Sequence, residues 1–144
     1  MTILITGTSG LIGNALAESM ANSHNVLCLS RSETKAQGVT AIQADFTSPN
    51  GLRLLDDHQI DALVHLAAVT GAGPESECIR VNVHGTYGLL RYLVDRGCKK
   101  LVLASSVAAV GMQSKYFRPL QLPIPDEHPC LDQHGYGVSK YLME

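Results

Sequence analysis

The sequence predicts a doubly wound α/β fold, in which a parallel sheet lies between two layers of helices as a three-layer α/β/α sandwich. Short apolar runs without polar alternation recur along the chain, a pattern typical of parallel strands buried on both faces. Longer stretches with apolar residues at helical spacing separate these runs, and this alternation predicts right-handed crossover connections. A glycine-rich segment joins the first strand to the first helix, where such folds need a tight turn.

Five strands are expected, each a short run rich in Val, Ile, Leu or Ala. The first begins directly after Met1, with Ile3, Leu4 and Ile5 at its centre. In a doubly wound sheet of this kind, the strands are expected in the order 3-2-1-4-5. The expected strands cover residues 2–6, 25–30, 39–44, 62–66 and 100–105.

Four helices are expected between and after these strands. Ser48 and Pro49 form a typical helix start, because serine caps a helix and proline fits its first position. Gly97 is a typical helix end. The proline-rich segment 111–133 is expected to be irregular. The expected helices cover residues 11–23, 49–58, 75–96 and 134–144.

The composition limits the classes of function that this chain can have. The chain has 144 residues, 45% of them hydrophobic, so residues 1–144 are expected to form one domain with its own core. The net charge of -2 argues against nucleic acid or a membrane surface as a partner. No apolar run reaches the ~18 residues of a membrane helix, and Met1 does not open a signal peptide. A cytoplasmic location is therefore expected. The four cysteines and six histidines are scattered, so we expect free thiols and no metal site.

The first strand leads into a turn with three glycines, Gly7, Gly10 and Gly13. Glycines at this spacing let the backbone turn tightly and approach a pyrophosphate, and the last one permits close packing of helix on strand. The helix begins with Leu11 and Ile12, and its free N–H groups suit a phosphate. The sequence therefore predicts a dinucleotide site of the Rossmann type. A glycine-rich turn without a ligand is the alternative.

The end of the second strand bears on the choice of cofactor. Binders of NAD usually carry an acidic residue there, which holds the adenosine ribose. This chain has Ser30, Arg31 and Ser32 instead. Arg31 suits a 2'-phosphate, with Ser30 as an additional donor. The prediction is NADP, with NAD as the open alternative.

Tyr136 and Lys140 lie four residues apart in the last expected helix, so both side chains are expected on one helix face. A nearby cation favours the phenolate form of a tyrosine, which suits acid–base chemistry near neutral pH. Lys140 is therefore expected to activate Tyr136 and to bond the nicotinamide ribose. Ser106, at the end of the fifth strand, is expected to hold and polarise the substrate oxygen.

Together these segments resemble the short-chain dehydrogenase/reductase superfamily, and most closely its extended, NAD-dependent epimerase/dehydratase-like branch. The motifs occur in the family's order across essentially all 144 residues. They are the glycine turn at 6–13, the Asp-Phe pair at 45–46, His-Leu-Ala-Ala at 65–68, Asn-Val-His-Gly-Thr at 82–86, the serine strand at 101–106, the acidic-proline loop at 125–129 and Tyr-Gly-Val-Ser-Lys at 136–140.

The resemblance implies further roles. His65 is expected to be a hydrogen-bonded structural histidine, and Asn82 is expected to tie the long helix to neighbouring backbone. An ordinary turn aspartate is the alternative for Asp45. The implied cofactor contacts are Asp45 and Phe46 at the adenine, Leu66, Ala67 and Ala68 along the cofactor, and Val81 near the nicotinamide.

Two departures from the branch bear on the reaction. Val110 stands where many sugar-nucleotide epimerases have a tyrosine, and no acidic residue lies near Ser30. Both favour a carbonyl reductase. The leading prediction is therefore an NAD(P)-dependent oxidoreductase that transfers hydride between the nicotinamide and a carbonyl or alcohol substrate. The alternatives are a nucleotide-sugar epimerase or dehydratase that uses bound NAD, and a dinucleotide-binding module without catalysis.

Family members usually continue for well over a hundred residues, so the chain is expected to be truncated before the substrate-binding C-terminal region. This leaves the activity of the isolated chain open. An uncovered fifth strand predicts self-association as a homodimer, through the long and final helices. The stripe of Tyr87, Leu90 and Val94 is expected to be core or dimer face.

Overall fold

The fold is a five-stranded parallel sheet flanked by helices, as expected. The computed structural model describes residues 1–71 and 73–144. The strand order is β3-β2-β1-β4-β5, which confirms the predicted order. Ile3 in the central strand is in register with Val26 and Ala62 of the two neighbouring strands. The strands are β1 (Thr2–Thr6), β2 (Asn25–Ser30), β3 (Thr40–Gln43), β4 (Ala62–His65) and β5 (Lys100–Leu103).

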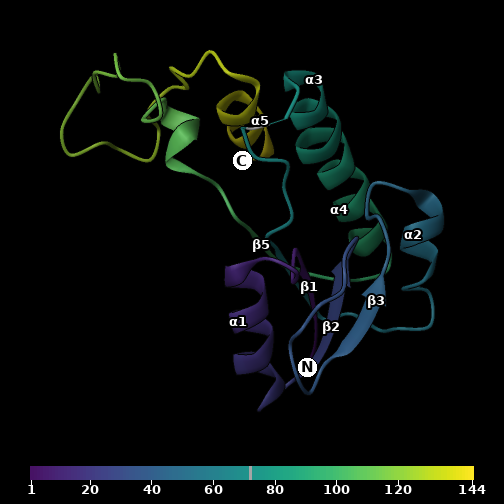
Figure 1. Cartoon of the computed structure of the whole chain (residues 1–144). Coiled ribbons are helices and arrows are strands. Elements are labelled where there is room, and N and C mark those ends of the chain that lie inside the picture. Colours follow the sequence, from purple (N-terminus) through teal and green to yellow (C-terminus); the bar gives the residue numbers. More distant parts are fainter. Residues whose placement is uncertain (72) are drawn as a thin grey trace. The chain divides into compact units, whose positions relative to one another are not determined.

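The chain forms two compact units, which are described separately. Unit 1 comprises Met1–Ala68 and His84–Ala104, and unit 2 comprises Val69–Val83 and Ser105–Glu144. In unit 1, α1 (Leu11–Ala21) covers one face of the sheet, and α2 (Pro49–Arg53) and α4 (Thr86–Asp95) lie on the other (Figure 1). Unit 2 contains α3 (Glu75–Cys78), the 3-10 helix η2 (Val107–Val110) and α5 (Gly135–Met143).

The central strands are apolar because both of their faces are covered. Leu4, Ile5 and Leu63 are completely buried, and Leu27 is nearly so. Each buried side chain of this size stabilises the fold by ~1.5–3 kcal/mol. Strand β5 differs, because Val102 is 58% exposed. The expectation of burial on both faces is therefore correct for the centre of the sheet and wrong for the two edge strands, β3 and β5.

The long helix expected over residues 75–96 is interrupted. A π-helical segment, η1 (Ile79–Gly85), separates α3 from α4. Such segments are rare and are frequently found at functional sites. The apolar spacing alone gave no sign of it. The predicted stop is confirmed, because Gly97 has a φ of 91° and its N–H donates to the carbonyl of Val94.

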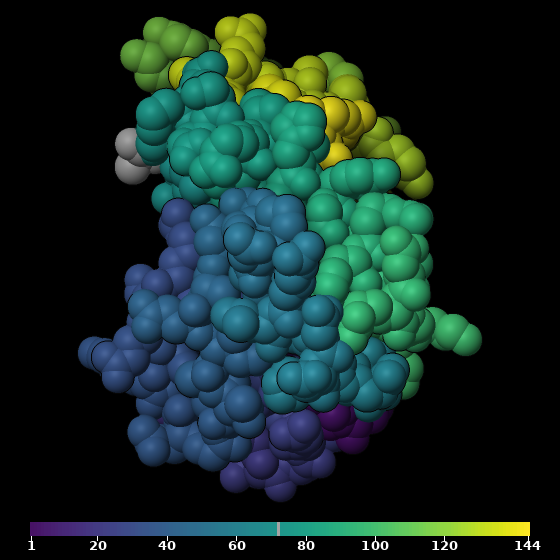
Figure 2. Space-filling model, turned by 90° about the vertical axis from the view of Figure 1, so that its right-hand side faces the viewer, coloured from purple at the N-terminus to yellow at the C-terminus, as the bar shows by residue number. Residues whose placement is uncertain are grey.

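Helix α4 is fastened to the segment after α2 within unit 1. The Tyr92 hydroxyl donates to the Asp56 carboxylate at 2.7 Å, and Arg96 pairs with the same carboxylate at 3.3 Å. Figure 2 views the molecule from the side that carries α2 and α4. On α4, Leu89 and Leu93 are buried, whereas Tyr87 and Val94 are exposed. The predicted stripe of Tyr87 and Val94 is therefore not core.

Two general properties complete the fold. None of the described helices is both long and apolar enough to cross a membrane. Within residues 1–71 and 73–144, no three His, Cys, Asp or Glu side chains come together as metal ligands. All four cysteines are free thiols, and all except Cys130 are buried.

Candidate active site

The glycine turn of unit 1 has the geometry that a pyrophosphate requires. Gly7 has a φ of 76°, and a Cβ atom there would lie 2.7 Å from the N atom of Ala67. Gly10 donates its N–H to the Gly7 carbonyl at 3.1 Å. A Cβ atom on Gly13 would collide with that same carbonyl. Gly7 and Gly13 are therefore needed for the close path of the backbone, whereas a Cβ atom on Gly10 would lie 3.3 Å from the Gly7 carbonyl oxygen.

The first turn of α1 fits an anion. Gly10 is its N-cap, no described side chain caps it, and its first turn carries no acidic residue. Leu11 is 90% exposed and Ile12 is 72% exposed. The end of α1 thus presents N–H groups with a partial positive charge beside an uncovered apolar surface. These residues fit the pyrophosphate of a dinucleotide.

A buried hydrogen-bond chain holds the strand ends beside this turn. The Thr6 hydroxyl oxygen accepts N–H bonds from Leu66 and Ala67, both at 3.2 Å. Because both of its lone pairs are used, the hydroxyl donates its own hydrogen bond to Nδ1 of His65, at 2.7 Å. The Nε2–H of His65 is left to donate to Thr86 at 2.9 Å. The expectation of a structural histidine is confirmed.

A small cavity lies at the end of β2 in unit 1. Its volume is about 180 Å³, and Ser30, Ser32 and Glu33 are among its lining residues. Ser30 donates to the Ser9 hydroxyl at 3.0 Å, which joins this cavity to the glycine turn. Arg31 is exposed. Glu33 was missed in the sequence because it lies three residues beyond the strand instead of at its end.

The side chains of Asp45 and Phe46 both make contacts within unit 1. One carboxylate oxygen of Asp45 accepts the backbone N–H of Thr47 at 2.9 Å and its hydroxyl at 2.8 Å. The buried ring of Phe46 packs edge-on against His65, with the ring centroids 5.0 Å apart. The turn role of Asp45 is thus present, and its contact with adenine stays a prediction. Val81 is buried in unit 2, and its predicted place near the nicotinamide is also untested.

Ser106 is the N-cap of η2 in unit 2. Its hydroxyl oxygen accepts the N–H of Ala108 at 3.2 Å, which leaves the hydroxyl proton available to a substrate oxygen. Helix α5 packs against η2. A Cβ atom on Gly137 would lie 2.6 Å from the Ala108 carbonyl. The glycine that follows Tyr136 therefore lets α5 approach the segment that begins at Ser106.

Tyr136 and Lys140 lie one turn apart on α5, as predicted. Tyr136 is partly exposed, whereas Lys140 is only 3% exposed. Burial lowers the pKa of Lys140, because a charge loses its hydration there. The lysine therefore exchanges its proton closer to neutral pH than an exposed lysine does.

Asn82 holds the tyrosine segment in place. It accepts the Val69 N–H at 2.8 Å and donates to the Val69 carbonyl and to the Ser139 hydroxyl, both at 2.9 Å. Ser139 in turn donates to the backbone carbonyl of Tyr136 at 2.7 Å. The expectation that Asn82 ties the helix to neighbouring backbone is confirmed. Its link to Ser139 was not foreseen.

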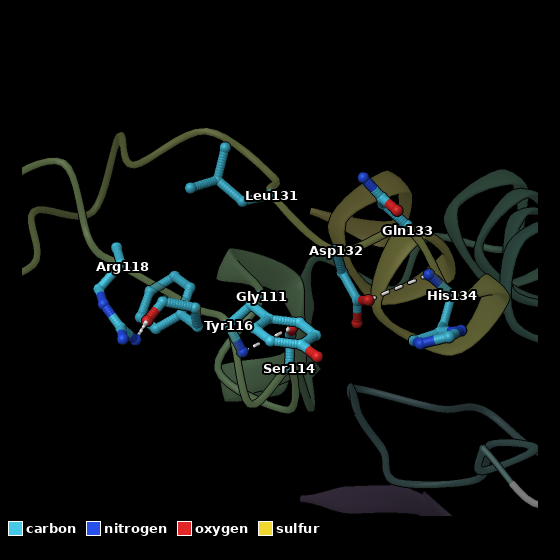
Figure 3. Close-up of a pocket in the computed structure, with 9 residues that line it drawn as sticks. Gly111, Ser114, Tyr116, Arg118, Leu131, Asp132, Gln133 and His134 are labelled. Atoms are coloured by element: carbon cyan, nitrogen blue, oxygen red, sulfur yellow. Dashed lines mark hydrogen bonds between the residues drawn. The ribbon is translucent and has the colours of Figure 1, made fainter.

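A cavity of about 320 Å³ precedes α5 in unit 2 (Figure 3). On its wall, the buried Asp132 accepts the N–H of His134, the N-cap residue of α5, at 3.0 Å. A carboxylate there also suits the positive end of the helix. Sequence reasoning missed Asp132, although an aspartate just before a helix is a usual start signal. The cavity is lined by Gly111, Ser114, Tyr116, Phe117, Arg118, Leu131, Asp132, Gln133 and His134.

The structure thus groups the predicted site residues by unit. The glycine turn, Ser30, Arg31, Asp45, Phe46 and residues 66–68 belong to unit 1. Ser106, Tyr136, Lys140 and Val81 belong to unit 2. Within unit 2, the segments that carry the three predicted catalytic residues pack on one another.

Comparison with known proteins gives the family. The model of the NAD dependent epimerase/dehydratase family matches residues 3–144. The chain is 28% identical to UDP-glucose 4-epimerase 4 of Oryza sativa subsp. japonica, over 99% of this chain and 43% of that protein.

Two solved structures are similar in both fold and sequence. One is a short-chain dehydrogenase/reductase superfamily protein of Agrobacterium tumefaciens with bound NAD, at 26% identity and a TM-score of 0.85, covering 99% of this chain and 43% of that one. The other is the enzyme WbmG of Bordetella bronchiseptica in complex with NAD, at 27% identity and a TM-score of 0.85, covering 99% and 47%. WbmG has also been solved with NAD and UDP together.

The chain spans less than half the length of these relatives. The match nevertheless runs from the first strand through the glycine turn and the Ser-Tyr-Lys segments to the last residue. It is in the order that the sequence motifs predicted. The chain belongs to the NAD dependent epimerase/dehydratase family, within the short-chain dehydrogenase/reductase superfamily.

Proposed function

We propose that this protein is the dinucleotide-binding and catalytic part of an NAD-dependent epimerase that acts on a nucleotide sugar. The observation that carries the proposal is the arrangement in unit 2, where Tyr136 and the buried Lys140 share α5 and that helix packs on the segment capped by Ser106. The relatives are UDP-glucose 4-epimerases, which favours the epimerase over the reductase that we first expected from the sequence.

Each side chain has a distinct role in this proposal. Ser106 donates a hydrogen bond to the reacting oxygen of the sugar. Tyr136 takes the proton from that oxygen and later returns it, so it serves as base and then as acid. Lys140 supplies the nearby charge and exchanges protons with Tyr136. Bound NAD would accept a hydride and return it, which leaves no net redox change.

We further propose NAD as the cofactor. The glycine turn of Gly7, Gly10 and Gly13 would hold its pyrophosphate, with the first turn of α1. Glu33 lines the cavity at the end of β2 and would accept bonds from the ribose hydroxyls, as an acidic residue does in NAD binders. NADP, favoured by Arg31, is the alternative. Separate fluorescence titrations with NADH and NADPH distinguish them, and at least tenfold tighter NADPH binding contradicts this proposal.

The role of Tyr136 is tested by Tyr136→Phe. We expect the interconversion of UDP-galactose and UDP-glucose to slow by ~10²–10⁴-fold, because general acid–base catalysis contributes about that much. The affinity for NAD should stay within about twofold. Tyr141→Phe, on an exposed tyrosine of the same helix, is the matched control and should keep full turnover.

Three other results would redirect the proposal. Full turnover by the Tyr136→Phe protein would remove Tyr136 from the reaction. Net oxidation of NADPH by a carbonyl substrate would support a reductase, which Val110 favours. Tight NAD binding without turnover on either substrate would support a binding module.

A further inference from the structure

Tyr136 lines a second cavity of unit 2, also about 320 Å³ in volume. We propose that this cavity receives the hydroxylated sugar ring, and that Glu75 is a specificity-determining residue that accepts hydrogen bonds from ring hydroxyls. The inference rests on the proposed function, since it assigns the reacting sugar to the cavity beside Tyr136.

Glycines bring the walls of this cavity close to Tyr136. A Cβ atom on Gly71 would lie 3.9 Å from the Tyr136 Cβ atom. A Cβ atom on Gly135 would lie only 2.6 Å from the Glu75 Cβ atom. Glu75 therefore packs directly on the residue that precedes Tyr136, and both Glu75 and Tyr136 line this cavity. The cavity is lined by Gly71, Gly73, Glu75, Cys78, Gln113, His134, Gly135 and Tyr136.

The backbone that precedes the loop wall is held by the same network that holds the tyrosine. Asn82 binds both backbone groups of Val69, from which the chain continues to Gly71 and Gly73. It also binds Ser139, which holds the carbonyl of Tyr136. One buried amide thus links the backbone of Val69 to the segment that carries Tyr136.

The charges of the cavity select a neutral ligand rich in hydroxyl groups. None of the described lining residues is a lysine or an arginine, so a phosphate finds no fixed cation there. An ionised carboxylate only accepts hydrogen bonds, which complements a donor such as a sugar hydroxyl. Glu75 lies 3.7 Å from Nδ1 of His134, and both side chains are mostly exposed. Because both side chains are mostly exposed, the carboxylate remains able to bind a ligand.

Cys78, another lining residue, adds no charge to the cavity. Cys78 is buried, and burial, reinforced by the Glu75 carboxylate, raises the pKa of its thiol. Its Sγ faces the carbonyl of Val69 at 4.0 Å. Gln113 supplies a group that both donates and accepts. The volume lies at the lower end of small-molecule sites, which span ~300–1,000 Å³, and it suits one ring of a substrate.

The test compares a ligand that carries the ring with one that lacks it. UDP-glucose and UDP are titrated by calorimetry into the NAD-loaded protein. For Glu75→Gln, we expect UDP-glucose to bind about fivefold more weakly and UDP to bind unchanged, because only the sugar meets this carboxylate. The matched control is Glu77→Gln. Glu77 lies on the same helix but binds Arg80 at 2.6 and 2.8 Å, so its replacement should leave both affinities unchanged.

Each remaining outcome decides the inference. Unchanged UDP-glucose affinity in Glu75→Gln overturns the assignment of Glu75 and leaves the proposed function standing. An equal loss for UDP and UDP-glucose also overturns it, since the carboxylate would then act on the nucleotide. A wild-type protein that binds NAD but neither uridine compound contradicts the proposed substrate, and the inference is lost with it.

Discussion

At the scale of single residues, the burial of Lys140 has a consequence for stability. Burial lowers the pKa of this lysine in the folded protein, so between that value and the unfolded value the unfolded chain binds more protons. The free energy of unfolding therefore rises with pH across this window. Below the window the desolvation cost is fully present, and above the unfolded pKa it is gone.

Lys140→Met isolates this effect. Methionine keeps much of the side-chain volume without the charge, so the free energy of unfolding of the variant relative to wild type should be highest near pH 7. That advantage should shrink steadily as the pH rises towards the unfolded lysine value of 10.5. Urea unfolding between pH 7 and pH 10.5 measures the difference, with Lys115→Met, on an exposed lysine of unit 2, as the control. A difference that stays constant over this range would show that burial does not disturb Lys140.

At the scale of elements, the hydrogen bond from Tyr92 to Asp56 joins α4 to the segment that follows α2. Burial, together with the hydrogen bond to Asp56, raises the pKa of Tyr92 to about 12 from its usual value of 10. The bond therefore stabilises the fold fully below pH 10, and its contribution is lost as the pH rises towards 12.

Tyr92→Phe should lower the free energy of unfolding by about 1 kcal/mol at pH 7, the usual worth of one such hydrogen bond. The deficit relative to wild type should shrink as the pH rises above 10 and be lost near pH 12. Chemical unfolding at pH 7, 9 and 11 measures it. Tyr87→Phe, on the exposed tyrosine of the same helix, should change stability by less than about 0.5 kcal/mol. Equal losses in the two variants would mean that the Asp56 bond is not the source of the effect.

The Asn82 network is the corresponding link in unit 2. Asn82→Ala removes three hydrogen bonds from a fully buried amide and leaves the Val69 N–H and carbonyl without their partner. We expect a loss of about 2–4 kcal/mol in the free energy of unfolding. Ser139→Ala removes the bond that this hydroxyl accepts from Asn82 and the bond that it donates to the Tyr136 carbonyl, and should cost about 1–2 kcal/mol. In the double variant the two losses should be less than additive, because both residues belong to one network; full additivity would contradict it.

The regular elements could be predicted from sequence because local pattern determines them. Apolar runs predicted the five strands, the doubly wound fold predicted their order, and Gly97 predicted the end of α4. The π-helical segment Ile79–Gly85 was not predicted, because the apolar spacing continues through it without a break. Asn82 within it bonds to Val69 and Ser139, which lie 13 and 57 residues away in the sequence. The expected helix over residues 49–58 ends already at Arg53, after which the chain forms tight turns through Leu55 to His58.

The candidate site shows the same division. The catalytic serine, tyrosine and lysine are marked by spacing within short motifs. Glu33, Glu75 and Asp132 lie outside those motifs, and only the folded backbone places them at cavities. Gly135 and Gly137 flank Tyr136 in the sequence, yet their meaning depends on how closely Glu75 and Ala108 approach.

At the scale of the whole molecule, the described surface carries apolar side chains that suit another copy of the chain. On α4, Tyr87 is 67% exposed and Val94 is 45% exposed, and positions seven apart share one helix face. On α5, Tyr141 and Leu142 are exposed as well. Apolar groups on long helices favour helix–helix association, because they are removed from water when two such faces pack together.

We therefore predict a homodimer in which α4 takes part. Light scattering coupled to size exclusion should give twice the chain mass of 15.4 kDa. The double replacement Tyr87→Lys and Val94→Lys should raise the dissociation constant at least about tenfold, since it buries two charges where aromatic and aliphatic groups would pack. Ser19→Lys, on the exposed side of α1, is the control and should leave the dimer intact. A wild-type protein that remains a folded monomer at a concentration of about 100 µM would contradict the prediction, because a specific interface commonly binds in the micromolar range or tighter.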